Sequence, residues 1–408
     1  MPARKRRRRA RRRDLRRRWY LLVPLLPLAL VVVLLTRSRS HAPKPSAKSS
    51  ASQKIPKQRA PVPNVNTAAQ IASTYNSVIR RAGGDGAWLK RAAEPAVGDS
   101  EPQEGEALAL APAAQGIIRA MEQQAAHDGL GLQVHRSDPS KGSTALTLDE
   151  VAVSQGNRVV CTWRLKQVAR LYRAAIVIDD LGQDLRPAHE LLEIPYSLTF
   201  SILPNLPASR ETAVAANRDG REVMLHLPME PLAARLNPGE GAIRVGMRSP
   251  DVDRLIEADL ASVPYVAGVN NHMGSRATSD AALMAAVMKK LGSRRLYFID
   301  SRTTGSTVAL EAARQAGIPA FYRSVFLDDT ESVSYTLGQL QRLRTAVEEH
   351  GEALAIGHPH PTTITALHEF LPQLERDDIE VVPASRLAGI RETARLAAAP
   401  VRSTGNED

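Results

Sequence analysis

From residue 174 onward, short continuous apolar runs alternate with segments of helical periodicity. The apolar runs are AAIVID, SLTFSIL, EVMLHL, VAGVNN, RLYFID, IPAFYRSV, EALAIG and IEVVP. The helix candidates between them are residues 208–218, 250–262, 279–291, 306–316, 334–349 and 362–376. Continuous apolar strands that alternate with helices predict an α/β fold with a parallel sheet, either a (β/α) barrel or a doubly wound sheet. No Gly-rich fingerprint follows the first strand, so the pattern does not support a dinucleotide-binding fold.

Polar residues cluster at the ends of these apolar runs. In chain order they are Asp179 and Asp180; His226, with Glu230 four residues later; Asn270, Asn271 and His272; Asp300, Ser301 and Arg302; Arg323 and, a little further on, Asp328; and His358 and His360. The carboxyl ends of parallel strands share one face of a sheet, and ligands bind at that face. The clustering therefore predicts a functional site that several strand ends build together.

The adjacent carboxylates of Asp179 and Asp180 suggest a cation. Two neighbouring carboxylates repel each other unless a cation or a proton separates their roles, and a divalent metal with imidazole ligands would supply that cation. Adjacent strand residues point to opposite faces, so both carboxylates reach one site only where the strand is ending, and Leu181-Gly182 permits such a break. The alternative is that one aspartate caps a helix while the other faces solvent.

The other candidates also have plain structural explanations. Taken singly, His226 and His272 fit histidines of a packed core, and Glu230 fits a residue at the rim of a site. The segment from His358 to His360 places two imidazoles on one side of an extended, Pro-containing stretch. Asp300 and Arg302 are expected to pair and orient other groups. Asp328 and Asp329 are expected in a solvated turn.

A smaller α+β module is predicted at residues 67–170, with a role in packing or docking. A helical pattern over about 67–92 ends at Gly-Gly, a polar linker follows at 93–106, and a second helix is expected at 107–127. GLQVHRS, STALTLDEV and RVVCTWRLKQV then alternate as strands. Cys161, the only cysteine, lies in the last of them and is expected to behave as a small buried hydrophobe.

The N-terminal region predicts a membrane anchor. Residues 1–18 form a basic arm that accounts for the formal net charge of +11, so the rest of the chain offers no basic surface for nucleic acid. The next residues, 19–36, carry no charge. They consist of the apolar run WYLLVPLLPLALVVVLL followed by Thr36. As a helix it would span about 25 Å. The positive-inside rule predicts a signal anchor in the inner membrane, with a cytoplasmic arm and the rest of the chain in the periplasm or outside. A cleaved signal peptide is the alternative.

The remaining boundaries follow from composition. Residues 37–66 are rich in Pro, Ser, Lys and Ala and are expected to form a disordered linker. Residues 171–392 are assigned to the sheet-containing domain, and residues 393–408 to a disordered tail. The expected partners are therefore the membrane, through the N-terminal helix, and possible envelope proteins, but no nucleic acid.

The ordered set VIDDLG, GREVMLHLPMEP, NNHMGSR, FIDSRT and IGHPHP resembles the divergent polysaccharide deacetylases. The resemblance covers about residues 172–390 and implies a distorted (β/α) barrel and a metal-dependent hydrolase of N-acetyl groups on a glycan such as peptidoglycan. By position in the motifs, Asp179 is implied as general base and His358 as general acid, with His360 as its substitute. The implied cofactor is a divalent metal, with zinc favoured.

The second motif departs from the family pattern. The family has a second histidine four residues after the first, whereas this chain has Glu230 four residues after His226. The interpretation favours Asp180, His226 and His272 as metal ligands and keeps Glu230 as the substitute. Asn271, Asp300 and Arg302 are further candidates to line the site.

Two other functions compete with the hydrolase. One is a barrel with weak or lost catalysis that binds glycan or an envelope partner. A measurement of metal content would distinguish it from the hydrolase, because binding alone needs no metal. The other is a glycosidase in which Asp179 pairs with Glu230 or Asp300. The abundance of histidines at the strand ends favours the metal-dependent reading over the glycosidase.

Overall fold

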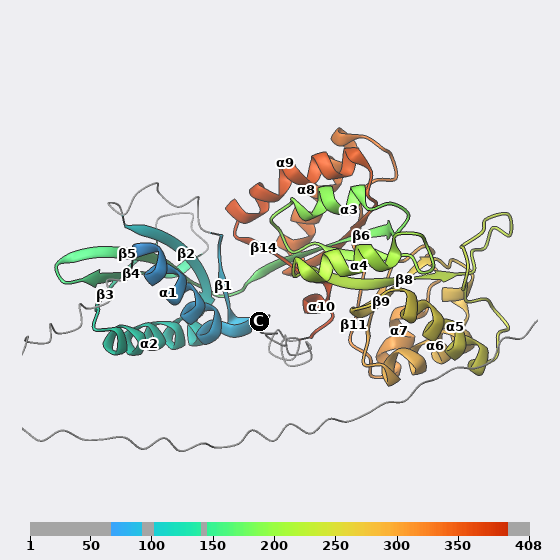
Figure 1. Cartoon of the computed structure of the whole chain (residues 1–408), viewed down its shortest axis with the longest axis horizontal. Coiled ribbons are helices and arrows are strands. Elements are labelled where there is room, and N and C mark those ends of the chain that lie inside the picture. Colours follow the sequence, from blue (N-terminus) through green and yellow to red (C-terminus); the bar gives the residue numbers. More distant parts are fainter. Residues whose placement is uncertain (1–66, 92–101, 140–144, 391–408) are drawn as a thin grey trace, which may run out of the picture. The chain divides into compact units, whose positions relative to one another are not determined.

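The computed structural model describes residues 67–91, 102–139 and 145–390 (Figure 1). The predicted basic arm, anchor, linker and C-terminal tail lie outside these ranges. Across the described ranges, no helix has both the length and the apolar character needed to cross a membrane.

The larger part is an α/β fold built on a curled, all-parallel sheet, the half-barrel (Figure 1). In the described residues its nine strands are β6 (Tyr172–Leu181), β7 (Thr199–Ile202), β8 (Glu222–Met229), β9 (Val266–Met273), β10 (Tyr297–Asp300), β11 (Ala320–Tyr322), β12 (Val325–Phe326), β13 (Glu352–Gly357) and β14 (Ile379–Val382). Their order is β11-β10-β9-β8-β7-β6-β13-β12, and β14 also pairs with β6. The predicted parallel α/β architecture is confirmed. The run IPAFYRSV forms two short strands, β11 and β12, rather than one.

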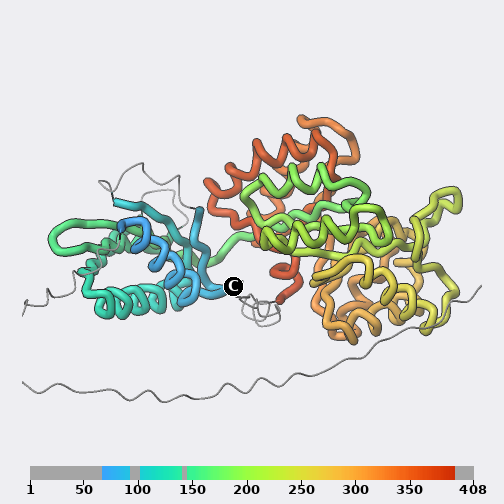
Figure 2. Tube along the Cα trace, in the orientation of Figure 1, coloured from blue at the N-terminus to red at the C-terminus, as the bar shows by residue number. Residues whose placement is uncertain are grey.

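Helices connect the successive strands except β11 and β12, and a last helix follows β14, as Figure 2 traces along the chain. They are α3 (Arg186–Leu192), α4 (Ser209–Arg218), α5 (Ser249–Ser262), α6 (Ala281–Ser293), α7 (Ala309–Gln315), α8 (Val333–His350), α9 (Pro361–Arg376) and α10 (Ala384–Leu387). Alternate residues of β6 serve two cores. Ala174, Ile176 and Ile178 pack into the core that most of these helices share, whereas Ala175 and Val177 pack into a smaller cluster that includes Leu387 of α10. Both faces of β6 are thus buried, which explains its continuous apolar sequence.

Strand β6 ends in a bulge, which explains how two adjacent aspartates can follow its apolar residues. Ile178 pairs with Phe200 and Leu181 with Ile202, so β6 has one extra residue over this interval. Asp180 adopts a left-handed backbone conformation with φ of 57°. A bulge re-aims the side chains beside it. The strand therefore continues to Leu181, and the irregularity at Asp180 allows both carboxylates to contribute to one site.

The N-terminal module has its own five-stranded sheet and two helices in the described residues. Its elements are α1 (Ala68–Gly83), β1 (Ala87–Leu89), β2 (Gln103–Leu110), α2 (Ala111–Asp128), β3 (Gly131–Ser137), β4 (Ala145–Gln155) and β5 (Arg158–Val168). The predicted helix at 107–127 begins only at Ala111, because residues 103–110 pair with β5 as a strand. Cys161 is fully buried in the core between the sheet and the helices, and burial raises the pKa of its thiol to about 12.

Candidate functional site

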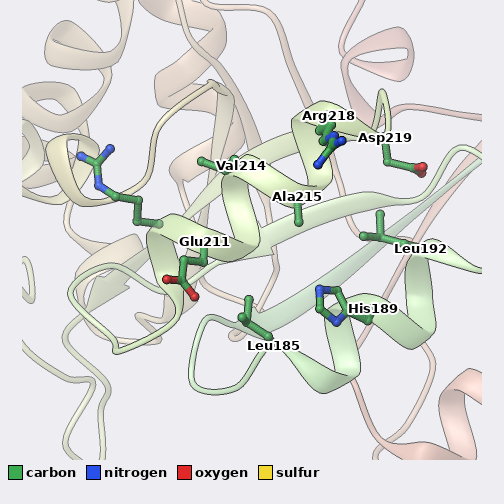
Figure 3. A pocket seen from close by; sticks show the side chains of 9 residues that line it. Leu185, His189, Leu192, Glu211, Val214, Ala215, Arg218 and Asp219 are labelled. Carbon is green, nitrogen blue, oxygen red and sulfur yellow. The ribbon is translucent and has the colours of Figure 1, made fainter.

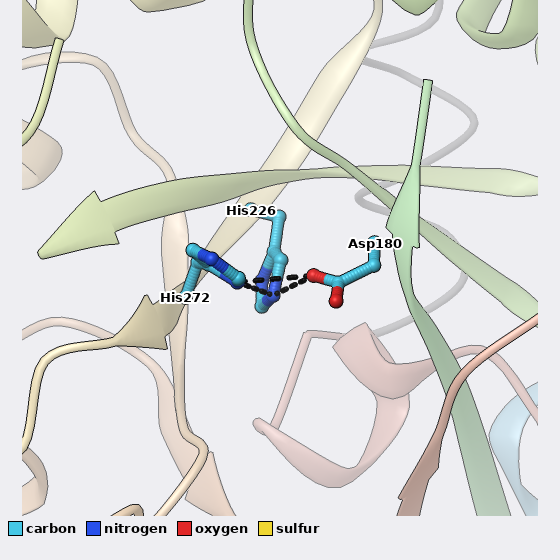
Figure 4. Close-up of side chains that lie close together, drawn as sticks. All are labelled: Asp180, His226 and His272. Carbon is cyan, nitrogen blue, oxygen red and sulfur yellow. Dashed lines mark hydrogen bonds and ion pairs between the residues drawn. The ribbon is translucent and has the colours of Figure 1, made fainter. Parts of the chain in front are cut away.

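Three potential metal ligands converge from three strands of the half-barrel (Figure 4). Asp180 comes from the bulge of β6, His226 from β8 and His272 from β9. Asp180 Oδ1 lies 3.2 Å from His226 Nε2 and 3.0 Å from His272 Nδ1, and the two nitrogens are 3.2 Å apart. This set, the Asp180 triad, contains two imidazoles and one carboxylate.

The spacing of the Asp180 triad fits a metal site. Ligand atoms at about 2.0–2.1 Å from a tetrahedral zinc ion lie roughly 3.3 Å from one another, close to all three observed distances. His226 Nε2 and His272 Nδ1 lie within hydrogen-bond distance, and a proton on either one would join them, whereas a metal would be bound by the lone pairs of both. The buried Asp180 Oδ1 makes no hydrogen bond within the described residues. These features are what a cation between the three atoms would explain.

Asn270 connects the triad to Asp179. Its Oδ1 lies 2.8 Å from His226 Nδ1 and accepts a 2.7 Å hydrogen bond from Ser201, while its Nδ2 donates to Asp179 Oδ1 at 2.8 Å. An acceptor at Nδ1 places the proton of His226 there and leaves the Nε2 lone pair facing Asp180 and His272. Asn270 therefore fixes the tautomer of one imidazole and the orientation of a neighbouring carboxylate.

The charges of the site are strongly coupled. Burial alone would raise the pKa of Asp180, but the imidazoles of His226 and His272 outweigh it and hold that pKa well below its usual range. Burial alone would lower the pKa of His226, but the charges of Asp179 and Asp180 shift it upward. Asp180 is therefore a carboxylate at neutral pH, as a metal ligand must be.

His358, at the end of β13, is positioned by Asp328. The Asp328 carboxylate accepts hydrogen bonds from His358 Nδ1 at 3.0 Å, from the His358 backbone N–H at 2.6 Å and from Thr363 Oγ1 at 2.7 Å. His358 Nε2 then faces the site, 3.8 Å from Asp180 Oδ2. Burial lowers the pKa of His358, but the Asp328 hydrogen bond and the nearby carboxylates raise it to about 9.

The position of Asp328 corrects the expectation of a solvated turn. Its side chain is fully buried, whereas only the neighbouring Asp329 is exposed. The signal in the sequence was the apolar run Val325–Leu327 directly before it, which resembles the other strand ends.

A cavity of about 390 Å³ joins these groups. The residues that line it are Asp179, Asp180, His226, Asn271, His272, Met273, Ser301, Arg302, Thr303, Arg323, Phe326, Asp329, Ile356 and His358. Asn271 also links β9 to the next strand end, because its Oδ1 accepts from Ser301 N at 3.0 Å and its Nδ2 donates to Met273 O at 2.8 Å. The predicted strand-end residues thus line one cavity, except Glu230, Asn270, Asp300, Asp328 and His360.

Glu230 lies outside the cavity and supports a loop. Its carboxylate pairs with Arg276 at 2.9 Å and accepts from Val245 N at 2.8 Å, while its backbone N–H donates to Ile243 O. These contacts fasten residues 231–245 to the segment after β9. Glu230 therefore has its own partners, and His272 is the residue that faces His226.

Asp300 and His360 also lie away from the cavity lining. Asp300 is buried, and its Oδ1 accepts from the backbone N–H of Arg302 at 2.8 Å instead of pairing with the Arg302 guanidinium. His360 precedes α9, and its Nδ1 is 3.7 Å from Glu331. Neither Glu230 nor Asp300, the two carboxylates expected to pair with Asp179 in the glycosidase alternative, lines the cavity.

A larger hollow of about 680 Å³ lies between α3 and α4, away from the strand ends (Figure 3). Its lining mixes apolar residues such as Leu192 and Val214 with surface charges such as Glu211 and Arg218. Among the groups of possible metal ligands found in the described residues, none lies in this hollow. The smaller cavity is therefore the candidate functional site.

Comparisons with known proteins agree with the motifs. A family model for divergent polysaccharide deacetylases matches residues 176–388, more than half of the chain. The uncharacterized protein YibQ of Escherichia coli (strain K12) is 39% identical over 216 residues, 53% of this chain and 67% of that protein. An uncharacterized protein of Haemophilus influenzae is 35% identical over 215 residues, 53% of this chain and 76% of that protein.

A solved structure supports the fold as well. The crystal structure of an uncharacterized protein from Agrobacterium tumefaciens C58 has a TM-score of 0.52 and 24% identity, and the match covers 54% of this chain and 90% of that chain. The residues that the family model matches, 176–388, include every residue that lines the cavity. The resemblance drawn from the strand-end motifs is thereby confirmed, and the chain belongs to the divergent polysaccharide deacetylase family.

Proposed function

We propose that this chain is a metal-dependent hydrolase that removes N-acetyl groups from an envelope glycan, with peptidoglycan as the main candidate. The observation that carries the proposal is the convergence of Asp180, His226 and His272 at metal-ligand spacing, beside Asp179 and His358. Membership of the deacetylase family supports the substrate class. We further propose that residues 19–36 anchor the chain in the inner membrane, with the half-barrel in the periplasm.

Asp180, His226 and His272 would hold the metal, and this set of two nitrogens and one oxygen favours zinc. When bound, a divalent metal would lower the pKa of water at the site and polarise the amide carbonyl. The protein contributes a buried setting, and the Asn270 hydrogen bond keeps the His226 lone pair in place.

Asp179 acts as the general base. It is 3% exposed, and Asn270 Nδ2 holds its Oδ1 while its Oδ2 lies 3.5 Å from His226 Nε2. One carboxylate oxygen is thus fixed, and the carboxylate takes the proton of the attacking water. The hydroxyl oxygen forms the new bond to the acetyl carbon.

His358 acts as the general acid. Its pKa of about 9 keeps the imidazole protonated at neutral pH, and Asp328 orients it with Nε2 toward the cavity. When the C–N bond breaks, His358 gives its Nε2 proton to the leaving nitrogen. The products are acetate and a free amino sugar, so the protons and bonds balance.

The experiment combines metal content with acetate release. Full-length protein is purified without chelator, and metals are measured by mass spectrometry for the wild type, His226→Ala and His368→Ala. His368 is an exposed histidine of α9 and serves as the matched control. We expect about one zinc or similar ion per chain in the wild type and the control, and its loss in His226→Ala. Acetate release from N-acetylated peptidoglycan fragments should follow the same pattern.

Two results would contradict parts of the proposal. Absence of metal even after zinc is supplied would exclude the metal-dependent hydrolase. A bound metal without acetate release from any N-acetylated glycan would instead support the glycan-binding alternative.

A further inference from the structure

The cavity has a cationic wall where β10 and β11 end. Arg302 follows β10, Arg323 follows β11, and both line the cavity. Their guanidinium groups contact backbone carbonyls or aromatic rings, and within the described part of the chain neither forms an ion pair with a carboxylate. Asp329 lines the same cavity but pairs with neither of them. The reaction proposed above uses neither arginine.

Arg323 supports the backbone of this wall. Its Nε donates to Ser301 O at 2.6 Å and its Nη2 to Arg302 O at 2.9 Å, and its guanidinium lies 5.0 Å from the ring centre of Phe326. Two of these contacts, to Ser301 O and Arg302 O, therefore fix the segment that carries Arg302. Arg323 has little freedom to follow a ligand.

Arg302 is held differently, with its side chain left available. Its backbone has a φ of 50°, which is uncommon for a residue with a long side chain and persists only where the surroundings enforce it. Asp300 enforces it, because its Oδ1 accepts from Arg302 N while its Oδ2 accepts from Thr307 Oγ1 at 3.0 Å. The exposed guanidinium of Arg302 lies over the ring of Tyr322 at 5.2 Å and makes no side-chain hydrogen bond among the described residues.

Ser301 gives a second, independent indication of a ligand. It lines the cavity beside Arg302, is only 5% exposed, and its Oγ has no hydrogen-bond partner in the described structure. Buried hydroxyls are normally satisfied, so an unpartnered one in a cavity wall points to an acceptor that arrives with a ligand. A guanidinium and a hydroxyl side by side suit a carboxylate, which accepts two hydrogen bonds in one plane.

We propose that Arg302 forms an anion subsite that binds the carboxylate of an acidic N-acetylated sugar. The inference rests on the proposed function for the class of glycan and adds a preference for a sugar with a carboxylate beside the cavity. Arg323 and Asp300 position Arg302 and do not contact the ligand. The matching unit is N-acetylmuramic acid with a free lactyl carboxylate, as in a peptidoglycan strand whose stem peptide has been removed.

The test uses a pair of ligands that differ in one charge. Binding of the disaccharide of N-acetylglucosamine and N-acetylmuramic acid is compared with binding of the same disaccharide converted to its lactyl carboxamide. Isothermal titration calorimetry is done on full-length, zinc-supplied protein in an Asp179→Asn background, so that the ligand is not consumed. The variants are Arg302→Gln, Arg302→Lys and, as a control, Arg254→Gln. Arg254 is an arginine of α5 whose side chain is 70% exposed.

The background with Arg302 intact should bind the carboxylate form at least 10-fold more tightly than the carboxamide. Arg302→Gln should reduce this ratio to about 1–2, Arg302→Lys should retain part of it, and Arg254→Gln should leave it unchanged. Unchanged preference in Arg302→Gln, no preference with Arg302 intact, or no binding of either ligand would overturn the proposal. Thermal unfolding of each variant checks that the fold is retained.

Acetate release from the neutral N-acetylglucosamine dimer and from the acidic disaccharide is measured separately with wild-type Asp179. A carboxylate preference without acetate release would leave the anion subsite standing and refute the hydrolase. Acetate release from both sugars with equal kcat/KM, together with equal binding, would refute the anion subsite and leave the hydrolase standing.

Discussion

Two groups of one aspartate and two histidines lie at the strand ends of the half-barrel, and they differ in how the aspartate is satisfied. The Asp180 triad has ligand atoms 3.0–3.2 Å apart, and Asp180 Oδ1 makes no hydrogen bond in the described residues. In the other group, Asp328 with His358 and His360, the carboxylate accepts three hydrogen bonds. Proximity alone would make both groups metal sites.

The hydrogen bonds to the aspartate distinguish a group that can bind a cation from a group that orients a side chain. The hydrogen bonds of Asp328 use its lone pairs and lock one imidazole, so no strong ligand remains for a metal. Asp180 Oδ1 makes no hydrogen bond in the described residues, and it faces His226 Nε2 at 3.2 Å and His272 Nδ1 at 3.0 Å. We therefore expect one metal in the Asp180 triad and an oriented acid in the Asp328 group, and substitutions can separate these roles.

The largest expected effect is loss of metal in His272→Ala. Removal of one of three ligands should weaken zinc binding by more than the 10–100-fold typical of a residue that only orients a ligand. Acetate release should fall to background. Zinc affinity is measured by competition with a chromophoric chelator.

Glu230→Gln is the matched variant at the position where the family has a second histidine. It should keep its zinc, because Glu230 contacts Arg276 and Val245 instead of His226. Loss of zinc in Glu230→Gln and retention in His272→Ala would reverse the ligand assignment.

The second-largest expected effect is a fall in kcat of about 100-fold in Asp328→Asn, with zinc content unchanged. General acid catalysis contributes about 10²–10⁴-fold, and Asp328 both orients His358 and supports its protonated form. Metal content by mass spectrometry and kcat from acetate release test both parts. Loss of zinc in Asp328→Asn would show that the two groups do not have separate roles.

The apolar runs placed all three residues of the Asp180 triad at strand ends that must meet in a parallel sheet, and the resemblance to the deacetylase motifs favoured them as the metal ligands. The apolar run before Asp328 indicated a strand end, but Asp-Asp-Thr-Glu also fits a solvated turn, and the contact of Asp328 with His358 depends on how that turn folds. Glu230 matched a spacing in the family motif, but its partner Val245 lies beyond a loop whose path no local pattern reveals. The pattern of apolar and polar residues along the chain predicted the strand ends. The hydrogen-bond partners of each carboxylate depend on the paths of the loops, which that pattern does not determine.

Asn270 offers a third test, on the link between the triad and the base. Asn270→Ala should lower zinc affinity by about 10-fold, because His226 loses the acceptor that fixes its tautomer. Asn270→Asp keeps that acceptor but sets a second charge against Asp179, so it should retain zinc better than Asn270→Ala while still lowering kcat. Equal zinc affinity in wild type and Asn270→Ala would show that the hydrogen bond is not needed for binding.

Asp259 of α5 shows what burial does to a carboxyl group that has no cationic partner. Its Oδ1 accepts from Asn205 Nδ2 at 3.0 Å, its Oδ2 has no partner in the described residues, and burial raises its pKa to about 7. The native state therefore keeps a proton that the unfolded chain releases near pH 4. Stability conferred by this proton is present at low pH and is lost as the pH rises toward 7.

Asp259→Asn should remove this pH dependence, since the amide keeps the acceptor and carries no charge. The variant should match the wild type near pH 4 and exceed it by about 2–4 kcal/mol in free energy of unfolding above pH 8. Denaturant unfolding of both proteins at several pH values gives the difference. A constant difference across this range would mean that Asp259 is ionised in the native state.

The smallest expected effect is in His360→Gln, and it decides whether the Asp328 group binds metal at all. The His360 ring centre is 5.9 Å from that of His358, and its closest charged partner is Glu331 at 3.7 Å, outside the cavity lining. We expect zinc content to be unchanged and kcat to change by less than about twofold, because His360 touches neither the Asp180 triad nor the proton donor's Nε2. Mass spectrometry under saturating zinc is the sensitive readout. A second ion in the wild type that disappears in His360→Gln would show that the hydrogen bonds of Asp328 can be exchanged for metal coordination, and the contrast between the two groups would fail.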